Sequence, residues 1–272
     1  MDEQTSTTGN VEIIKWRGGM SSTGVDCLAA EEPLEIRVND VPLAVTMRTP
    51  GHDKSLALGF LASEGIVQSY KDVFDVLRCS DPEHPDLRNI VNVIVDPSRH
   101  QLVADSGRQR YATSSCGLCG RATIESVLRD ATPLDGSFRI SRDVILSLPD
   151  KLRKAQSIFE LTGGLHGVGL FDHLGNLLHV AEDIGRHNAV DKVIGMALEN
   201  GPWPPEDCVL MVSGRAGFEI VQKAAAVGIP GVCSVSAPST LAVELAREMN
   251  IVLAGFLRGE SMNLYSCQNA VT

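Results

Sequence analysis

The sequence predicts an α/β protein with an α+β N-terminal part, and two observations near the C-terminus carry this prediction. Residues 209–212, 231–235 and 251–256 are apolar runs of the kind that form buried parallel strands. Helical segments at 220–227 and 241–249 alternate with them and end at Gly228 and Asn250, residues that accept a left-handed backbone. This βαβαβ order predicts a parallel sheet with right-handed crossovers.

The N-terminal part is predicted to begin with β structure after a loose polar tail at residues 1–10. Strand-like runs at 34–38 and 43–47 flank Asn39 and Asp40, which suit a tight hairpin turn. From Asp53 the apolar spacing becomes helical, with Asp53 as the expected cap and Gly65 as the expected end. Two further strands are expected at 73–77 and 90–95, separated by a surface loop at 81–86.

The middle of the chain predicts a second hairpin followed by a helix. Runs at 167–171 and 177–181 bracket a turn at 172–176, and apolar residues then recur at helical spacing from 189 to 198. We therefore expect a disordered tail at 1–10, an N-terminal α/β domain at 11–110 and a C-terminal domain at 111–272.

Composition narrows the class of protein. An apolar content of 43% supports a packed core, and no window approaches about eighteen consecutive apolar residues, so no membrane span is expected. The net charge of −10 disfavours DNA or RNA as the main partner, because such binding draws its affinity from Lys and Arg. Seven cysteines without the regular spacing of a disulfide framework predict reduced thiols and a cytoplasmic location.

The dithiol Cys116-Gly-Leu-Cys119 is the main candidate for chemistry. A plausible helix follows it, and the field at a helix start stabilises the thiolate, which is the attacking form of a thiol. Three roles stay open: half of a zinc site, a thioredoxin-type redox pair, or sulfur carriage through a persulfide. The sequence has no second Cys-x-x-Cys and no His-x-x-x-His to complete a zinc site, and no βαβ start precedes the motif.

The other five cysteines, Cys27, Cys79, Cys208, Cys233 and Cys267, are isolated in the sequence. Cys208 and Cys233 stand in strand-like runs, where a small buried hydrophobic residue is the better interpretation.

A charged stretch at 181–192 is the second constellation. Arg186, His187 and Lys192 could hold an anion near the start of a helix, whereas a solvated charged turn is the alternative. The segment Gly163-Gly-Leu-His166 offers flexible backbone and a histidine, which could equally be a satisfied core residue.

Three loops are expected at the carboxyl ends of the parallel strands, where open α/β sheets bind ligands. They are Ser213-Gly214-Arg215, the Ser236-Ala-Pro turn, and the segment Phe256, Leu257, Arg258, Gly259, Glu260 and Ser261. Two of them carry arginine, so backbone N–H groups and guanidinium forks would converge on phosphate. The alternative is ordinary connecting turns, since no Walker or Gly-x-Gly-x-x-Gly pattern is present.

These segments occur together in one family. The runs SSCGLCG at 114–120, EDIGRHNAVDK at 182–192, SGR at 213–215 and SAP at 236–238 appear in this order, with further matches between about 32 and 265. The chain resembles the formate dehydrogenase accessory sulfurtransferases of the FdhD/NarQ family. The resemblance implies a sulfur carrier that accepts sulfur from a cysteine desulfurase as a cysteine persulfide.

The implied acceptor is a molybdenum or tungsten ion bound by two guanine-dinucleotide pterins, the cofactor of formate dehydrogenase. Cys116 would carry the sulfur with Cys119 assisting, residues 256–261 would bind the cofactor, and no tightly held metal of the protein's own is expected. The resemblance also implies a homodimer, a partner formate dehydrogenase catalytic subunit, and a three-layer αβα C-terminal domain of cytidine-deaminase-like fold beside a smaller roll-like N-terminal domain.

Deaminase chemistry is not expected in spite of that fold. Zinc deaminases need a His-x-Glu before Pro-Cys-x-x-Cys, whereas this chain has no His-x-Glu and Ser115 stands at the position of the proline. A cofactor-binding chaperone without sulfur transfer and a dithiol oxidoreductase remain as alternative functions.

Overall fold

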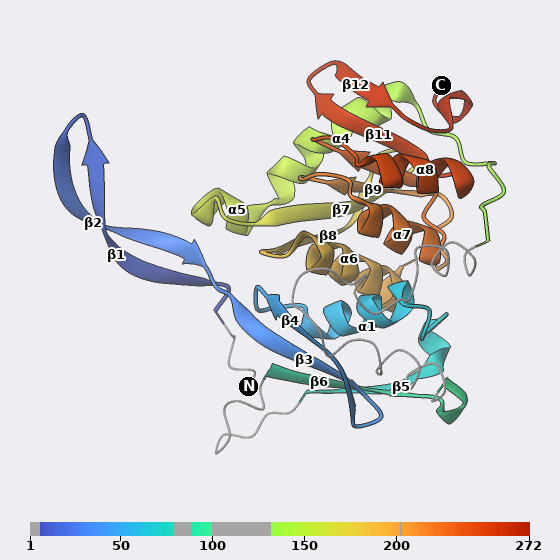
Figure 1. The fold of residues 1–272 in the computed structure, drawn as a ribbon, viewed down its shortest axis with the longest axis horizontal. Coiled ribbons are helices and arrows are strands. Elements are labelled where there is room, and N and C mark those ends of the chain that lie inside the picture. Colours follow the sequence, from blue (N-terminus) through green and yellow to red (C-terminus); the bar gives the residue numbers. More distant parts are fainter. Residues whose placement is uncertain (1–5, 79–88, 100–131, 202) are drawn as a thin grey trace.

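The computed structural model describes residues 6–78, 89–99, 132–201 and 203–272, which form two sheets, a set of helices and a projecting arm (Figure 1). The dithiol at Cys116 and Cys119, Cys79, and the loop expected at 81–86 lie outside the described residues, as does the boundary expected between 110 and 111.

The larger sheet has six strands in the order β12-β11-β10-β9-β7-β8. Their bounds are β7 His166–Asp172, β8 Leu177–Asp183, β9 Cys208–Val212, β10 Gly231–Ser234, β11 Val252–Arg258 and β12 Ser261–Leu264. Strands β9, β10 and β11 are parallel, which confirms the predicted βαβαβ unit, and β7 and β8 form the predicted hairpin.

Helices cover both faces of this sheet. On one face α4 (Arg142–Ala155) packs its Ile145 and Leu148 against Met211 and Cys233. On the other face α6 (Arg186–Asn200), α7 (Phe218–Ala226) and α8 (Thr240–Glu248) pack against alternate strand residues such as Leu210. The two-residue period of a strand explains why Leu210 and Met211 belong to different cores. The predicted helix ends at Gly228 and Asn250 are confirmed, with φ angles of 78° and 56°.

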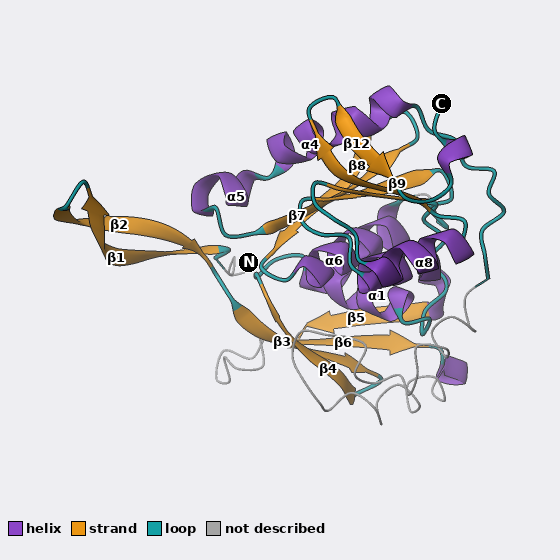
Figure 2. Cartoon of the chain, turned by 45° about the horizontal axis from the view of Figure 1, so that its top comes forward, coloured by secondary structure: helices purple, strands orange, loops and turns teal. Residues whose placement is uncertain are grey.

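The smaller sheet has the order β4-β3-β6-β5, with bounds β3 Glu32–Val38, β4 Val41–Arg48, β5 Val73–Arg78 and β6 Ile90–Val95. The β3–β4 hairpin turns at Asn39 and Asp40 with φ angles of 48° and 66°, as expected for a two-residue turn. Figure 2 shows α1 (Asp53–Ser63), α6 and α8 lying between the two sheets.

Helix α1 differs from the prediction at its start. The residue at the cap is His52, with φ 56°, and Asp53 lies inside the helix, so the predicted Asp53 cap is wrong. The carboxylate of Asp53 instead accepts hydrogen bonds from Arg48 at 2.9 and 3.1 Å, and an ion pair of this kind satisfies it better than one backbone N–H. The predicted end at Gly65 is confirmed, because that residue has φ 73°.

Two glycines let α1 and α6 cross at very short range. A Cβ atom on Gly59 would lie 1.7 Å from the carbonyl oxygen of Asp191, and one on Gly195 would lie 1.9 Å from that of Ser55. Buried residues of the smaller sheet and of the face of the larger sheet that carries α6 belong to one apolar cluster through this crossing, whereas the face under α4 belongs to a second cluster. The first and last parts of the described chain therefore share a core.

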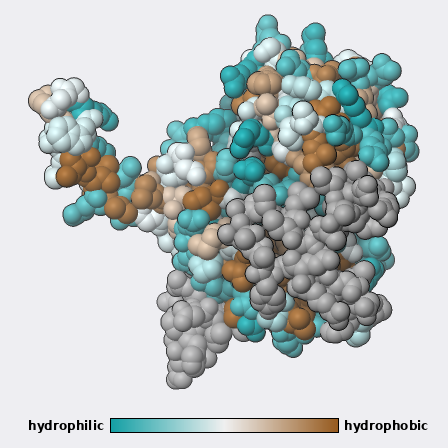
Figure 3. All heavy atoms as spheres, viewed as in Figure 1, coloured by the Kyte–Doolittle hydropathy of each residue, from teal (hydrophilic) through white to brown (hydrophobic). Residues whose placement is uncertain are grey.

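The arm is a long two-stranded hairpin, β1 (Thr8–Arg17) and β2 (Met20–Ala29), that projects from the body (Figures 1 and 3). Its base contacts α5 (Ser157–Thr162). Strand β1 begins inside the segment expected to be a loose tail, so that expectation is wrong for residues 8–10. The arm exposes large apolar side chains, namely Val11, Ile14, Trp16, Met20, Val25 and Leu28.

Short 3₁₀ turns at η1 (Tyr70–Asp72), η3 (Pro97–Arg99) and η5 (Gln268–Ala270) complete the described structure. Within the described ranges no helix has both the length and the apolarity needed to cross a bilayer.

Candidate functional site: one edge of the larger sheet

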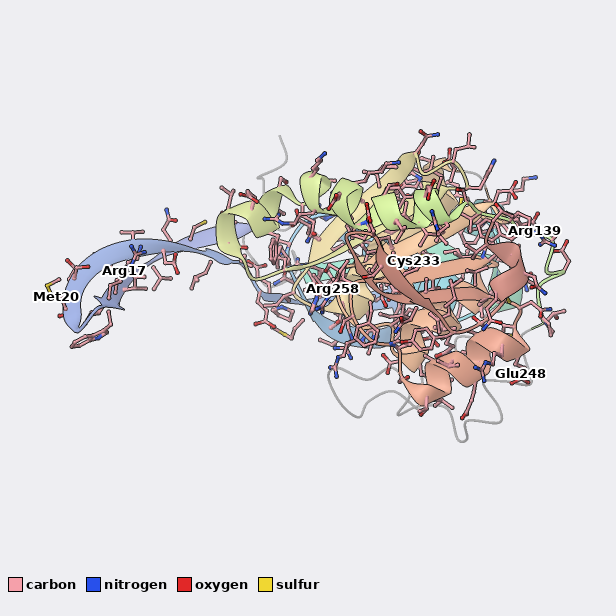
Figure 4. All side chains as sticks on the ribbon, turned by 90° about the horizontal axis from the view of Figure 1, so that it is seen from above. Arg17, Met20, Arg139, Cys233, Glu248 and Arg258 are labelled. Carbon is pink, nitrogen blue, oxygen red and sulfur yellow. The ribbon has the colours of Figure 1, made fainter. Side chains whose placement is uncertain are left out.

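The candidate site lies along the edge of the larger sheet where β8, β9, β10 and β11 end and β7 begins. The antiparallel register of β7 with both β8 and β9 brings His166 opposite Asp183 and Val168 opposite Val212. The loops that follow these strands therefore meet at one edge, as the sequence predicts for three of them. Figure 4 shows Arg258 on the side of the body that faces the arm, away from Arg139 and Glu248.

Ser213 and Gly214 hold the start of β7 against the end of β9. The backbone N–H of Gly167 donates to Ser213 Oγ at 2.9 Å, and the Ser213 N–H donates to the Gly167 carbonyl at 2.9 Å. A Cβ atom on Gly214 would lie 3.4 Å from His166 Nδ1, so the imidazole rests directly over this glycine. Ser213 is thus engaged within the fold, and Gly214 lies against the ring of His166.

Ser236 shapes the neighbouring part of the edge through its backbone. Its carbonyl accepts hydrogen bonds from Ser234 Oγ at 2.7 Å and from the Phe256 N–H at 3.2 Å. The register of β11 with β12 shifts between Gly255 and Arg258, and within this irregularity Phe256 has φ 55°. A left-handed conformation is unusual for a bulky residue, and here it accompanies a ring that is 39% exposed.

Residues 256–261 form the end of β11 and the turn into β12. Ser261 Oγ donates to the Arg258 carbonyl at 2.9 Å, and Gly259 has φ 55°, so the turn is closed by its own backbone. Arg258 and Glu260 are exposed, whereas the side chain of Leu257 is buried. Leu257 can therefore meet a ligand only through its backbone.

The charged stretch at 181–192 is mostly buried, so its interpretation as a solvated turn is wrong. Lys192 Nζ lies 2.7 Å from Asp183 Oδ2 and donates to the Thr49 carbonyl at 2.8 Å. An ammonium held in this way has no face left for an anion, and the expectation that Lys192 helps to bind one is wrong. Asp191 is likewise buried and accepts hydrogen bonds from Lys223 at 2.8 and 2.9 Å.

His187 also has a partner, because its Nε2 lies 2.9 Å from Glu219 Oε2. An anion that binds His187 would compete with this carboxylate. By contrast, Arg186, Arg215 and Arg258 form no hydrogen bond or ion pair through their guanidinium groups with any other residue in the described part of the chain.

That lack of partners sets the three arginines apart. Every other described arginine except Arg17, at the arm tip, donates to a carboxylate, amide or carbonyl oxygen: Arg37, Arg48, Arg78, Arg99, Arg139, Arg142, Arg153 and Arg247. Unpaired guanidinium groups gathered at one edge of a chain with net charge −10 favour a bound anion.

Burial makes three of the described cysteines poor nucleophiles. Burial raises the pKa of Cys208 to about 11 and that of Cys233 to about 12, and it also raises the pKa of Cys267. The interpretation of Cys208 and Cys233 as buried small hydrophobic residues is confirmed. Over the described ranges, no three His, Cys, Asp or Glu side chains are grouped to hold a metal ion.

Fold and edge together define an α/β protein that presents unpaired arginines at the carboxyl ends of its strands, the usual position for a phosphorylated ligand. The model of the FdhD/NarQ family matches residues 29–272. The chain therefore belongs to the FdhD/NarQ family, and the resemblance found in its sequence motifs is confirmed.

Individual relatives and one solved structure agree with this assignment. The sulfur carrier protein FdhD of Streptomyces coelicolor is 47% identical over 264 residues, which are 94% of this chain and 92% of the relative. The protein of the same name from Mycobacterium tuberculosis is 46% identical over 257 residues, 92% of this chain and 93% of the relative. A crystal structure of a candidate formate dehydrogenase accessory protein from Desulfotalea psychrophila superposes with a TM-score of 0.79 at 23% identity. It covers 98% of this chain and 100% of that chain, and at this identity the likeness concerns the fold.

Proposed function

We propose that this protein is a sulfur carrier for formate dehydrogenase, a sulfurtransferase that uses a cysteine persulfide. The observation that carries the proposal is the identity of 47% over 94% of the chain to a relative named a sulfur carrier protein. The donor is a cysteine desulfurase. The Cys116 thiolate attacks the terminal sulfur of the donor persulfide, a new S–S bond forms at Cys116, and the donor cysteine leaves as a thiolate.

The substrate that receives the sulfur is the molybdenum cofactor with two guanine-dinucleotide pterins. The edge described above supports this choice, because its arginines suit phosphate and the exposed ring of Phe256 suits a base. We assign cofactor binding to residues 256–261 together with Ser213, Gly214, Arg215, Ser236 and His187. In this assignment the Phe256 ring stacks on guanine and Arg258 binds a phosphate.

The remaining parts of the proposal follow the family resemblance. The protein acts in the cytoplasm as a homodimer and delivers sulfur to the cofactor before or during its insertion into the formate dehydrogenase catalytic subunit. The part from residue 132 onward, a sheet with helices on both faces, is consistent with a cytidine-deaminase-like arrangement.

Sulfur loading provides the first test. The protein is incubated with a cysteine desulfurase and cysteine and then weighed intact without reductant, as wild type, Cys116→Ala, Cys119→Ala and Cys267→Ala. We expect wild type and the Cys267→Ala control to gain the mass of at least one sulfur atom and Cys116→Ala to gain none. Equal gain in Cys116→Ala and wild type would refute Cys116 as the carrier.

The role of Cys119 follows from the same spectra. If Cys119 attacks the persulfide, the two cysteines close a disulfide and sulfide leaves, so Cys119→Ala retains more persulfide than wild type. If Cys119 relays the sulfur, its replacement leaves loading intact and blocks activation of the formate dehydrogenase.

The alternative functions predict different outcomes. A chaperone without sulfur transfer binds guanine nucleotide and still supports a formate dehydrogenase after both cysteines are replaced. A dithiol oxidoreductase forms a reversible disulfide and turns over a thiol substrate without a desulfurase. A zinc protein retains about one equivalent of zinc after purification, and elemental analysis detects it.

A further inference from the structure

His166 and Arg186 are two side chains at the edge that the proposed function leaves without a role. His166 is half-buried, and its imidazole forms no hydrogen bond with another described residue. Arg186, at the start of α6, lies close enough for its charge to act on that imidazole. His166 is the first residue of β7 and lies opposite Asp183, the last residue of β8, and Arg186 begins α6 three residues further along the chain.

The carboxylates near this pair are already engaged. Asp183 binds Lys192 at 2.7 Å, and its Oδ1 accepts hydrogen bonds from the Gly185 N–H at 2.8 Å and from the Asn188 amide at 3.1 Å. Glu219, from α7, pairs with His187 at 2.9 Å. The positive charge of Arg186 therefore has no local counter-ion in the described structure.

Gly214 lies beside the imidazole, since a Cβ atom at this position would be in van der Waals contact with His166 Nδ1 at 3.4 Å, and the exposed Arg215 follows it in the chain. A residue with no Cβ allows an approaching oxyanion to reach the backbone. A half-buried imidazole, an unpaired guanidinium and an adjacent glycine are the components of a phosphate subsite.

We infer that His166 and Arg186 bind the diphosphate of the guanine nucleotide tail of the cofactor. This inference rests on the proposed function, and it adds two residues to the segments assigned there. Arg186 supplies a planar fork to two phosphate oxygens. His166 donates an N–H to the same group and binds it best as the imidazolium.

The charges around His166 give this subsite a pH dependence. Burial lowers the pKa of His166 in the ligand-free protein, the charges of Arg186 and His187 lower it further, and Asp183 raises it. A bound phosphate adds negative charge beside the ring and raises that pKa again, so binding takes up a proton. The contribution of His166 to affinity is present at low pH and is lost as pH rises through the pKa of the bound state.

Calorimetric titration of the full-length protein with GDP, inorganic pyrophosphate and guanosine tests the inference. The variants are His166→Gln, Arg186→Gln and Arg186→Lys. The controls are His173→Gln, in the exposed turn between β7 and β8 at the opposite edge of the sheet, and Arg142→Gln, on the surface of α4. The melting temperature of each variant is measured to establish that it is folded.

We expect Arg186→Gln to weaken the binding of GDP and of pyrophosphate by about tenfold or more. Guanosine binding should be unchanged, because guanosine has no phosphate. Arg186→Lys retains part of the affinity, since it keeps the charge and loses the fork. The affinity advantage of the wild type over His166→Gln shrinks between pH 6 and pH 8. Titrations in buffers of different ionisation enthalpy report a smaller proton uptake for His166→Gln than for the wild type. The two controls match the wild type.

Three results separate this inference from the proposed function. Equal GDP and pyrophosphate affinities in wild type, His166→Gln and Arg186→Gln overturn the inference and leave sulfur loading of Cys116 standing. Pyrophosphate binding that depends on both residues without any GDP binding supports the subsite and refutes the guanine part of the proposed function. Failure of the wild type to bind either ligand overturns both the subsite and the nucleotide site.

Discussion

The ammonium of Lys192 and the carboxylate of Asp183 form a buried ion pair in which Nζ lies 2.7 Å from Oδ2 and the side chains are 1% and 0% exposed. Asp183 Oδ2 also accepts the Thr49 N–H at 3.1 Å, and Lys192 donates to the Thr49 carbonyl at 2.8 Å. The pair therefore ties the segment before α1 to α6, the helix that begins with Arg186 and His187.

Replacing Lys192 by Met tests how much this buried pair contributes to stability. The change leaves the Asp183 carboxylate buried without its counter-ion, so we expect the free energy of unfolding to fall by about 3–5 kcal/mol in a urea titration. The control is Arg142→Gln, which removes an exposed pair with Asp143 at 3.1 Å and should cost less than about 1 kcal/mol. A loss of similar size in both variants would show that burial of the pair does not matter.

Replacing Gly195 by Ala tests the crossing of α1 and α6. The new methyl group would meet the Ser55 carbonyl at 1.9 Å, so the two helices must separate and we expect a loss of about 3 kcal/mol or more. At an ordinary helical position the same change stabilises the protein by roughly 0.5–1 kcal/mol. The sign of the change in unfolding free energy therefore distinguishes a close crossing from an ordinary helical position. Gly9→Ala is the control, because nothing lies within 4 Å of its Cβ position. A variant as stable as wild type contradicts the close crossing.

The buried thiol of Cys233 predicts a loss of stability at alkaline pH. Its pKa is raised by burial from 9.0 to about 12, so the folded state holds the thiol proton while the unfolded state releases it above pH 9. Unfolding is therefore favoured as pH rises from about 9 toward 12, and the stabilisation is complete below pH 9. We expect the free energy of unfolding to decline less steeply over this range in Cys233→Ala than in wild type. Parallel curves for the two proteins would contradict the prediction.

Elements that depend on local conformational preference could be predicted from the sequence, whereas the arm could not. The turn at Asn39 and Asp40, the helix ends at Gly228 and Asn250, and the buried strands each depend on local conformational preference, and all are confirmed. The arm was missed because β1 and β2 alternate weakly and bury little against the body, so their pairing leaves almost no hydrophobic pattern.

For the candidate site, the location could be predicted from the sequence, whereas the pairing of its charged side chains could not. Its segments could be located from the sequence because parallel strands place their carboxyl ends at one edge. The partner of Lys192 could not be predicted from the sequence, since Asp183 lies nine positions earlier and the pair forms only when β8 packs beside α6. Nor does any sequence pattern indicate which arginines stay unpaired, because that depends on where every neighbouring carboxylate points.

The left-handed backbone of Phe256 permits a last test, in which binding and stability should respond in opposite ways. If the ring stacks on guanine, Phe256→Ala weakens GDP binding by about 5- to 150-fold, corresponding to roughly 1–3 kcal/mol per stacked base, while Phe256→Tyr keeps most of the affinity. At an ordinary strand position alanine is more stable than glycine by roughly 0.5–1 kcal/mol. At φ 55° the Cβ atom is itself disfavoured, so Phe256→Gly should unfold at a temperature equal to or above that of Phe256→Ala, although both bind GDP equally weakly. GDP titrations and thermal unfolding of the three variants measure both effects, and an alanine variant that binds GDP like wild type would exclude the stacking role even if the stability order holds.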